Sequence, residues 1–278
     1  MVGVWREVGD RVFVRRYPFL DQNIGAIVAD DGVLVVDTRA SHRQADEIRR
    51  DLRAITNLPV SDVVNTHMHW DHVFGNARFR PAPIRGHERC AAALRANGEA
   101  QRAALAGRYP ELADELAEVE IVPPDQTFDE RATVTWGGRT VELRYLGRGH
   151  TDNDIVVVVP GPRPDAPEVV FAGDLLENGA PPWFGDGFPL DWPATAEAIV
   201  ALIGTPVGAV VVPGHGDVGD RAFAAGQAAE LGAIAELARQ VGGGELTLAQ
   251  AVQRGPYPPA TMVEALRRAQ AQLRGELG

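Results

Sequence analysis

The sequence predicts an α/β protein of four layers, in which two β-sheets pack face to face and helices cover both outer faces. Two observations favour this fold. Candidate strands cluster in two blocks, and each block is followed by helical sequence with no linker-like segment between them. The chain has 278 residues, of which 45% are hydrophobic and 23% charged, ordinary values for a globular protein with a sizeable core. We therefore expect a single domain over residues 1–278.

The first block of strands lies between residues 11 and 66. Short apolar stretches alternate there with turn residues, which is typical of strands. The expected strands are Arg11–Val14, Ile24–Ala29, Val33–Asp37 and Asp62–Thr66. Between the last two strands, Ser41 and Gln44 have the spacing of a capping box. The apolar residues that follow repeat at helical spacing, so we expect a helix there.

The second block follows an alanine-rich stretch, residues 86–120, whose pattern predicts helix. The expected strands of this block are Ala132–Trp136, Thr140–Leu146, Asp154–Val159, Glu168–Phe171 and Val207–Val212. A helix is expected from about Ala194, because the Gly- and Pro-rich segment 179–193 that precedes it is unsuited to regular structure. Residues 221–278 are mostly helical in pattern.

The composition excludes several classes of enzyme. All 27 basic residues are arginine, and the absence of lysine removes Schiff-base chemistry and a P-loop. Serine occurs only at Ser41 and Ser61, outside a G-x-S-x-G elbow, which argues against a serine hydrolase. The single cysteine, Cys90, forbids an intrachain disulfide and a thiolate zinc cluster. The net charge of −11 disfavours nucleic acid as a partner.

The N-terminal sequence and the lengths of the apolar stretches indicate where in the cell to expect the protein. The N-terminal residues lack the apolar stretch of a secretory signal, and no run approaches the roughly 20 apolar residues that span a bilayer. We therefore expect a cytoplasmic protein with no membrane partner. The sequence does not indicate the oligomeric state.

Most of the seven histidines lie in short polar motifs that suit metal binding. Imidazole is the commonest metal ligand, and carboxylates complete sites that lack thiolate. The motif HMHWDH contains His67, His69, Asp71 and His72. Because His67 and His69 are two residues apart at a strand end, their side chains can point the same way.

Three further candidate ligands share one context. His150, Asp174 and His215 each follow an apolar strand and a glycine. This pattern places each side chain on a loop at the same sheet edge, where a rigid scaffold presents functional groups. Asp37 ends the strand VLVVD, and we interpret it as a hydrogen-bond anchor beneath the site rather than a ligand.

The segments THMHWDHVFGN, GRGHTDND, FAGDLLE and VPGHGD, in this order, resemble the metallo-β-lactamase superfamily over about residues 10–220. The resemblance implies an αβ/βα sandwich of two mixed β-sheets flanked by helices, with a dinuclear metal site at one edge. It assigns His67, His69 and His150 to the first ion, Asp71, His72 and His215 to the second, and Asp174 to both. The ions would be divalent, with zinc preferred and iron or manganese also compatible.

The resemblance also implies a reaction. A hydroxide that bridges the two ions would attack a small ester, thioester, lactone or amide, and Asp71 would be the catalytic acid–base. Asp174 stands where one group of β-lactamases has a metal-binding cysteine, and the lysine used by such lactamases is absent. Similar lactonases often carry a tyrosine where Glu177 stands. The bridging aspartate fits the broader hydrolase branch of thioesterases, lactonases and esterases better than the antibiotic-resistance branch, so we expect a small-molecule substrate.

Two alternative functions stay open. A mononuclear iron oxygenase similar to persulfide dioxygenases would use His67, His150 and Asp174 as a facial triad. A metallo-nuclease, or a member that binds nucleic acid, would need a local basic patch in spite of the net charge.

The loop that follows Asp174 is unusually aromatic. It contains Trp183, Phe184, Phe188 and Trp192. These side chains are candidate substrate-binding residues that form a hydrophobic wall over the metals, or they fill the gap between sheet and helix.

Overall fold

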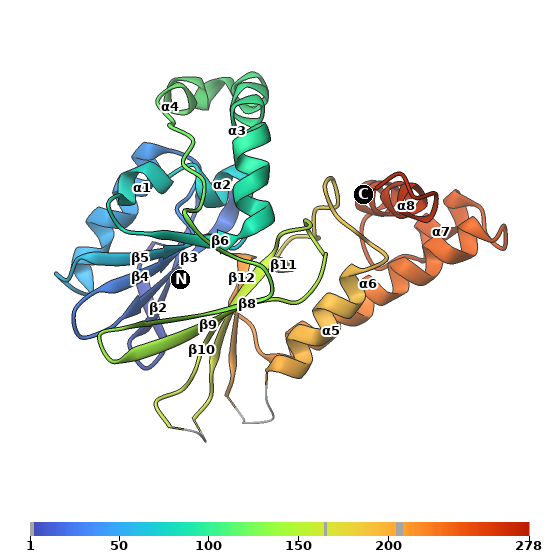
Figure 1. Ribbon diagram of the computed structural model, residues 1–278. Coiled ribbons are helices and arrows are strands. Elements are labelled where there is room, and N and C mark those ends of the chain that lie inside the picture. The colour runs from blue at the N-terminus through green and yellow to red at the C-terminus, as the bar shows by residue number, and fades with distance from the viewer. Residues whose placement is uncertain (1–2, 164–165, 204–207, 278) are drawn as a thin grey trace.

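The structure is a computed structural model that describes residues 3–163, 166–203 and 208–277 (Figure 1). Its strands are β1 (Trp5–Gly9), β2 (Val12–Tyr17), β3 (Gln22–Val28), β4 (Val33–Val36), β5 (Val60–Val64), β6 (Ile84–His87), β7 (Gln126–Phe128), β8 (Arg131–Trp136), β9 (Arg139–Tyr145), β10 (Ile155–Val159), β11 (Val169–Asn178) and β12 (Val210–Gly216). Its helices are α1 (His42–Asp51), α2 (Trp70–Val73), α3 (Glu88–Arg108), α4 (Ala113–Ala117), α5 (Trp192–Leu202), α6 (Arg221–Gly242), α7 (Leu248–Arg254) and α8 (Pro259–Leu273).

Within the described residues, the strands form one hydrogen-bonded sheet that consists of two halves. The order is β7-β6-β5-β4-β3-β12-β11-β10-β9-β8, and β2 and β1 are added beside β3. Both halves are mixed, since β4 to β7 and the pair β11–β12 are parallel while the β3–β4 and β10–β11 pairs are antiparallel. The halves join where His215 of β12 pairs with Gln22 of β3.

Side-chain alternation along the strands builds the layers. In β4, Val33 and Val35 pack towards α1, whereas Leu34 and Val36 pack against the other half of the sheet. In β10, Val156 and Val158 face α5 and α6, whereas Ile155, Val157 and Val159 face the first half. Because both faces of each half are covered, these strands are apolar throughout, as the run IVVVV shows. The predicted four-layer αβ/βα sandwich is confirmed.

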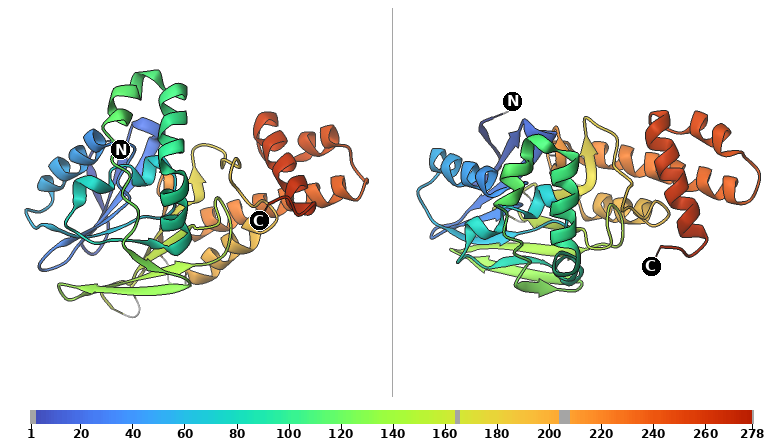
Figure 2. Two further views of the ribbon diagram at one scale, coloured as in Figure 1. Left: turned by 45° about the horizontal axis from the view of Figure 1, so that its top comes forward. Right: turned by 90° about the horizontal axis from the view of Figure 1, so that it is seen from above.

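The helical end packs on the outer face of the second half. Met262 and Leu266 of α8 belong to the same buried cluster as Leu231 of α6 and Val170 of β11. Figure 2 shows α7 and α8 beyond α6, where they extend the molecule to one side of the sandwich.

Several boundaries differ from those expected. The strands β11 and β12 continue beyond the glycines, so Asp174 and His215 lie within strands rather than on loops. The ladder between them is irregular from Phe171 to Glu177, which lets the backbone turn side chains towards the site. Helix α5 begins at Trp192, before the expected Ala194, and Val207, where the last strand was expected to begin, lies outside the described residues.

Three short strands, β1, β6 and β7, were not expected. The chain gives little signal for them, because β1 is partly exposed and β6 and β7 have only four and three residues. No helix in the described ranges combines the length and the apolarity needed to cross a membrane.

A substitution in β3 tests the face-to-face packing. A Cβ added at Gly25 would lie 2.4 Å from Cε1 of the buried Phe171 in the opposite half of the sheet. We therefore expect Gly25→Ala to lower the free energy of unfolding by about 1–3 kcal/mol, as overpacking does. Urea unfolding measures the change. Gly226→Ala in α6, where no atom lies within 4 Å of the added Cβ, is the control and should not destabilise. Equal stability of both variants would contradict the packing.

Candidate metal centre

The connection between β5 and α2 is tied to both halves of the sheet. The carboxylate of Asp37, directly after β4, accepts the N–H and the hydroxyl hydrogen of Thr66, each at 2.8 Å. The carbonyl oxygen of Thr66 accepts the N–H of Ile155 in β10 at 2.8 Å. The segment that follows presents four candidate ligands: His67, His69, Asp71 and His72.

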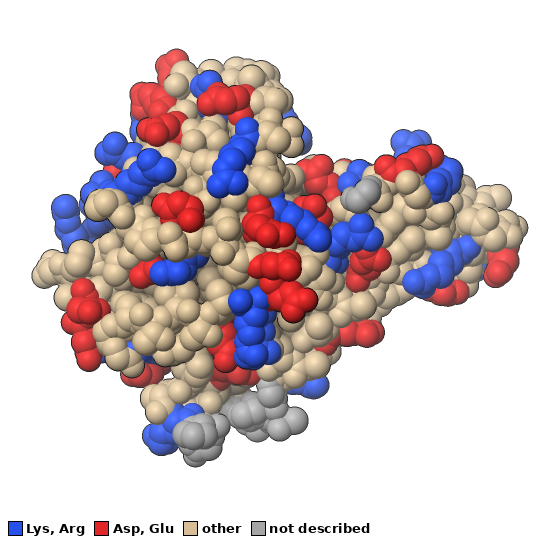
Figure 3. Space-filling view, in the orientation of Figure 1, with Lys and Arg blue, Asp and Glu red and all other residues tan. Residues whose placement is uncertain are grey.

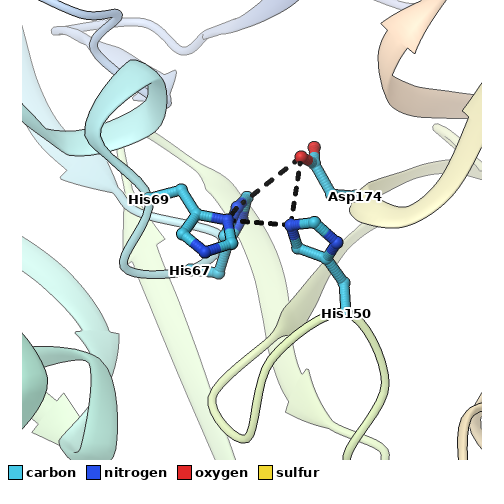
Figure 4. Close-up of side chains that lie close together, drawn as sticks. All are labelled: His67, His69, His150 and Asp174. Atoms are coloured by element: carbon cyan, nitrogen blue, oxygen red, sulfur yellow. Dashed lines mark hydrogen bonds and ion pairs between the residues drawn. The ribbon is translucent and has the colours of Figure 1, made fainter. Parts of the chain in front are cut away.

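The first cluster consists of three histidines and one aspartate (Figure 4). Nδ1 of His69 lies 3.1 Å from Nε2 of His67 and 2.8 Å from Nε2 of His150. Oδ2 of Asp174 lies 3.6 Å from Nε2 of His67 and 3.5 Å from Nε2 of His150. A tetrahedral ion bound at about 2.0–2.1 Å needs ligand atoms about 3.3–3.4 Å apart, close to these separations.

The second cluster consists of Asp71, His72 and His215. Nε2 of His72 lies 3.3 Å from Nε2 of His215, and Oδ2 of Asp71 lies 3.4 Å and 3.3 Å from the same two nitrogens. Asp174 stands between the clusters, because its Oδ1 is 3.3 Å from His72 Nε2 and its Oδ2 is 3.4 Å from His215 Nε2.

The nitrogen of each ring that faces away from the clusters meets an oxygen. The contacts join His67 to the Thr66 hydroxyl (3.1 Å), His69 to Asp186 (3.0 Å), His72 to Asp37 (2.8 Å), His150 to the Trp183 carbonyl (3.1 Å) and His215 to the Leu20 carbonyl (2.7 Å). Carboxylate and carbonyl oxygens only accept, and the Thr66 hydroxyl gives its own hydrogen to Asp37. We therefore assign the hydrogen to the outer nitrogen of every ring, which leaves a lone pair on every inner nitrogen when the ring is neutral.

This convergence of lone pairs requires a positive charge. Five imidazole nitrogens and two carboxylates face one another in a buried space, and Oδ1 of Asp174 has no hydrogen-bond donor among the described residues. A metal ion or a proton can supply the charge, and imidazole with carboxylate suits zinc, iron or manganese. The donor set therefore fits a divalent cation at each cluster.

The two clusters differ in how readily they hold protons. Burial and the neighbouring imidazoles lower the pKa of His67 well below its usual value and that of His150 to about 3. Burial also lowers the pKa of His72 and His215, but the carboxylates, Asp174 foremost, outweigh it and raise both pKa values well above normal. His67 and His150 of the first cluster are therefore neutral in the metal-free chain, whereas an ion at the second cluster must displace protons from His72 and His215.

A cavity of about 500 Å³ opens over both clusters. Its walls come from the C-terminal part of α3, the segment around Leu20 and the loop after β11. Trp70 and Tyr109 stack at 5.6 Å on one side, and Trp183 lies edge-on to His69 at 5.3 Å on the other. The polar lining residues outside the clusters include Asp21, Gln101, Arg108, Glu177, Asn178 and Asp186.

The aromatic loop residues do not share one role. Trp183 lines the cavity and is 42% exposed. Phe184, Phe188 and Trp192 do not line the cavity in the described structure, because they are buried between sheet and helix. Trp192 also donates its ring N–H to the carbonyl of Leu175 at 3.0 Å. The structure thus places one side chain at the cavity and three in the core.

Sequence reasoning missed three groups at the site. Asp186 stands in the Gly- and Pro-rich segment, where no ligand-like spacing marks it. Arg108 and the stacked Tyr109 lie at the end of α3, far along the chain from every metal motif. Their role depends on where α3 is packed, which the pattern of alanines does not reveal.

The fold and the site together define an αβ/βα sandwich protein with two clusters of candidate metal ligands at the junction of the two halves of its sheet. The family model of the metallo-beta-lactamase superfamily matches residues 17–215. The chain belongs to this superfamily, as its motifs predicted.

Curated relatives are similar over part of their length. The metallo-beta-lactamase type 2 of Bacillus cereus is 26% identical over 195 residues, which cover 68% of this chain and 65% of the relative. The metallo-beta-lactamase type 2 of Bacteroides fragilis is 30% identical over 126 residues, which cover 44% of this chain and 48% of the relative. The chain thus matches just under two thirds of the length of the Bacillus protein.

Solved structures share the fold. A metallo-beta-lactamase from Pontibacter korlensis has a TM-score of 0.61 at 21% identity, and the match covers 82% of this chain and 97% of that one. A stereoselective inverting sec-alkylsulfatase from Pseudomonas sp. has a TM-score of 0.75 at 16% identity, and the match covers 97% of this chain and 50% of that one. The second match therefore includes most of the helical end.

The protonation states of the histidines in the two clusters predict how the metal affinity of each cluster changes with pH. We expect the affinity of the second cluster for Zn²⁺ to rise more steeply with pH than that of the first, between about pH 6 and 8. Raised pKa values keep protons on His72 and His215 that the ion must displace, while His67 and His150 stay neutral. Calorimetric titration of the metal-free chain in several buffers measures both affinities and the protons released.

In the control variant His215→Ala, the steep step should disappear and the flatter one should remain. Identical pH dependence for the two ions would contradict the assignment.

Proposed function

We propose that the protein is a dinuclear metal-dependent hydrolase that acts on a small ester, thioester, lactone or amide. The observation that carries the proposal is the position of Asp174 between two clusters whose inner imidazole nitrogens converge. Membership of the metallo-beta-lactamase superfamily and the similarity to metallo-beta-lactamases support a hydrolase. Zinc is the proposed metal, and iron or manganese suits the same donors.

The proposed roles follow the geometry. His67, His69 and His150 would hold one ion, Asp71, His72 and His215 would hold the other, and Asp174 lies within reach of both sets. Two divalent ions at such a site lower the pKa of an enclosed water to near 7 and polarise the carbonyl oxygen of a substrate.

Asp71 is the proposed general acid–base. It faces the cavity, and its Oδ2 lies 3.3 Å from Nε2 of His215. The amide of Gln22 also donates to the backbone carbonyl of Asp71, which holds the turn in place. From there its carboxylate can orient the attacking water and carry a proton to the leaving atom.

The cavity favours a substrate with an aromatic or apolar part and an anionic group. Trp183 and the stacked pair of Trp70 and Tyr109 offer apolar surface on opposite sides. Arg108 is the arginine of the cavity wall, and among the described residues no carboxylate forms an ion pair with it. It lies instead 5.5 Å from the ring centre of Tyr109, so its guanidinium is available to a carboxylate or sulfate group of a substrate.

The structure gives less support to the alternative functions. A mononuclear iron oxygenase would use His67, His150 and Asp174, and the residues of the second cluster would then bind no metal. A nuclease would need a basic surface, but in Figure 3 arginines are interspersed with acidic side chains over the visible face.

Metal and activity measurements test the proposal together. We expect about two divalent ions per chain in freshly purified protein, and hydrolysis of at least one member of a panel of nitrocefin, thioester, lactone and aryl ester substrates. Asp174→Ala should lower kcat/KM by at least about 100-fold and reduce the metal content, because it removes a ligand from both clusters. The control Asp62→Asn changes a buried carboxylate that pairs with Arg85 at 2.8 Å, and should keep both ions.

Full activity with a single ion would contradict a dinuclear hydrolase. One iron per chain with consumption of oxygen would support the oxygenase instead, and cleavage of a phosphodiester alone would support the nuclease.

Arg108 predicts a preference among substrates. We expect Arg108→Met to raise KM about tenfold for an aryl ester that carries a carboxylate, equivalent to about 1.4 kcal/mol, and to leave KM for the neutral ester unchanged. Arg102→Met is the control, because Arg102 lies on the same helix but pairs with Glu99 at 2.7 Å. Steady-state kinetics on both esters measures the difference. An equal effect on both esters would show that Arg108 does not recognise charge.

A further inference from the structure

The C-terminal helix α8 is hydrogen-bonded to the loop that covers one side of the first cluster. The guanidinium of Arg268 donates to the carbonyl of Gly187 at 2.8 Å and to the carbonyl of Asp186 at 3.1 Å. The side chain of Gln272 accepts the N–H of Leu190 at 3.0 Å. Figures 1 and 2 show this loop beside α8.

The same loop contacts two imidazoles of the first cluster from their outer side. Oδ2 of Asp186 lies 3.0 Å from Nε2 of His69, and the carbonyl of Trp183 lies 3.1 Å from Nδ1 of His150. The contact with Asp186 places the ring hydrogen of His69 on Nε2. It therefore leaves Nδ1 free to face His67 and His150, where the separations are 3.1 Å and 2.8 Å.

The partner of His69 is less firmly held than the partner of His72. The former is a carboxylate on a surface loop, with a side chain that is 48% exposed, whereas the partner of His72 is the buried Asp37 within the sheet framework. A glycine precedes and a glycine follows Asp186, so the backbone around it has little stiffness of its own. The two bonds from Arg268 fall on this Asp–Gly step.

We propose that Arg268 is a positioning residue of the metal centre. It holds the loop so that Asp186 fixes the tautomer and the orientation of His69, and thereby sets the affinity of the first cluster for its ion. A carboxylate behind a ligating imidazole commonly controls affinity by tenfold to a hundredfold. The proposal rests on metal binding at the first cluster, and not on any particular substrate.

Under this proposal, the C-terminal helix α8 contributes to the metal centre. The superfamily match ends at residue 215, so Arg268 lies outside it. The coordinating face of His69 is nevertheless arranged through Arg268 and Asp186, which join α8 to the ring by three hydrogen bonds.

The experiment measures metal affinity of the full-length chain by competition with a chromophoric chelator for Zn²⁺ and Co²⁺. A His215→Ala background isolates the first cluster. We expect Asp186→Ala and Arg268→Met each to weaken binding by about tenfold to a hundredfold, and to alter the visible absorption of bound Co²⁺. Asp186→Asn, whose amide oxygen can still accept the ring hydrogen, should restore part of the loss.

Two comparisons separate positioning from a general loss of stability. Arg267→Met, an exposed arginine on the same helix, is the matched control and should change affinity less than twofold. If Arg268 acts through Asp186, the double variant should bind metal no more weakly than Asp186→Ala alone. Thermal unfolding of the metal-free chains shows whether each variant is folded at the temperature of the titration.

An Arg268→Met chain that is folded and binds metal as tightly as the parent would overturn the proposal, as would losses that simply add in the double variant. These outcomes differ from a failure of the proposed function, in which the parent chain itself would bind no metal or hydrolyse no substrate.

Discussion

The structure depends on one electrostatic constraint, the convergence of five imidazole nitrogens and two carboxylates at the base of one cavity. Each ring has its hydrogen fixed on the outer side, so the inner side presents a lone pair when the ring is neutral. Such a group is stable only around positive charge, and the surroundings decide whether that charge is a proton or a metal ion. In the metal-free chain, Asp174 and Asp71 favour protons on His72 and His215, whereas burial keeps His67 and His150 neutral.

The sandwich satisfies this constraint because the two halves of the sheet meet beneath the site. His215 pairs with Gln22 across the junction. Thr66 is hydrogen-bonded both to Asp37, which follows β4 of the first half, and to Ile155 in β10 of the second half. Ligands from distant parts of the chain are therefore attached to one rigid framework. The buried valines that alternate between the layers fix the distance between the halves, and hence the separation of the candidate ligands that each cluster takes from both halves.

The fold and the candidate ligands could be predicted from the sequence because each leaves a local pattern in it. The other residues of the site leave no such pattern. Strands buried on both faces are continuous apolar runs, and ligands at strand ends carry a local signature of glycine, histidine and aspartate. The positions of Asp186, Arg108 and Arg268 depend on how a loop and two helices pack, and no period or spacing encodes that. The aromatic loop shows the limit most clearly, because Trp183 and Phe184 are adjacent in sequence, yet one lines the cavity and the other is fully buried.

The division between framework and surroundings suggests where selectivity arises in this chain. The candidate ligands and their anchors, such as Asp37, lie on strands, on the connections that follow them or on the short helix α2, and they form the proposed metal centre. The cavity walls come from α3, from the segment around Leu20 and from the loop braced by α8, which lie outside the strands of the sheet. Arg108 and Trp183 stand on two of these walls, on opposite sides of the clusters. A change in a wall can therefore alter which substrate reaches the site while the ligand geometry stays the same, except at the three imidazoles whose outer partners belong to the walls, which are His69, His150 and His215.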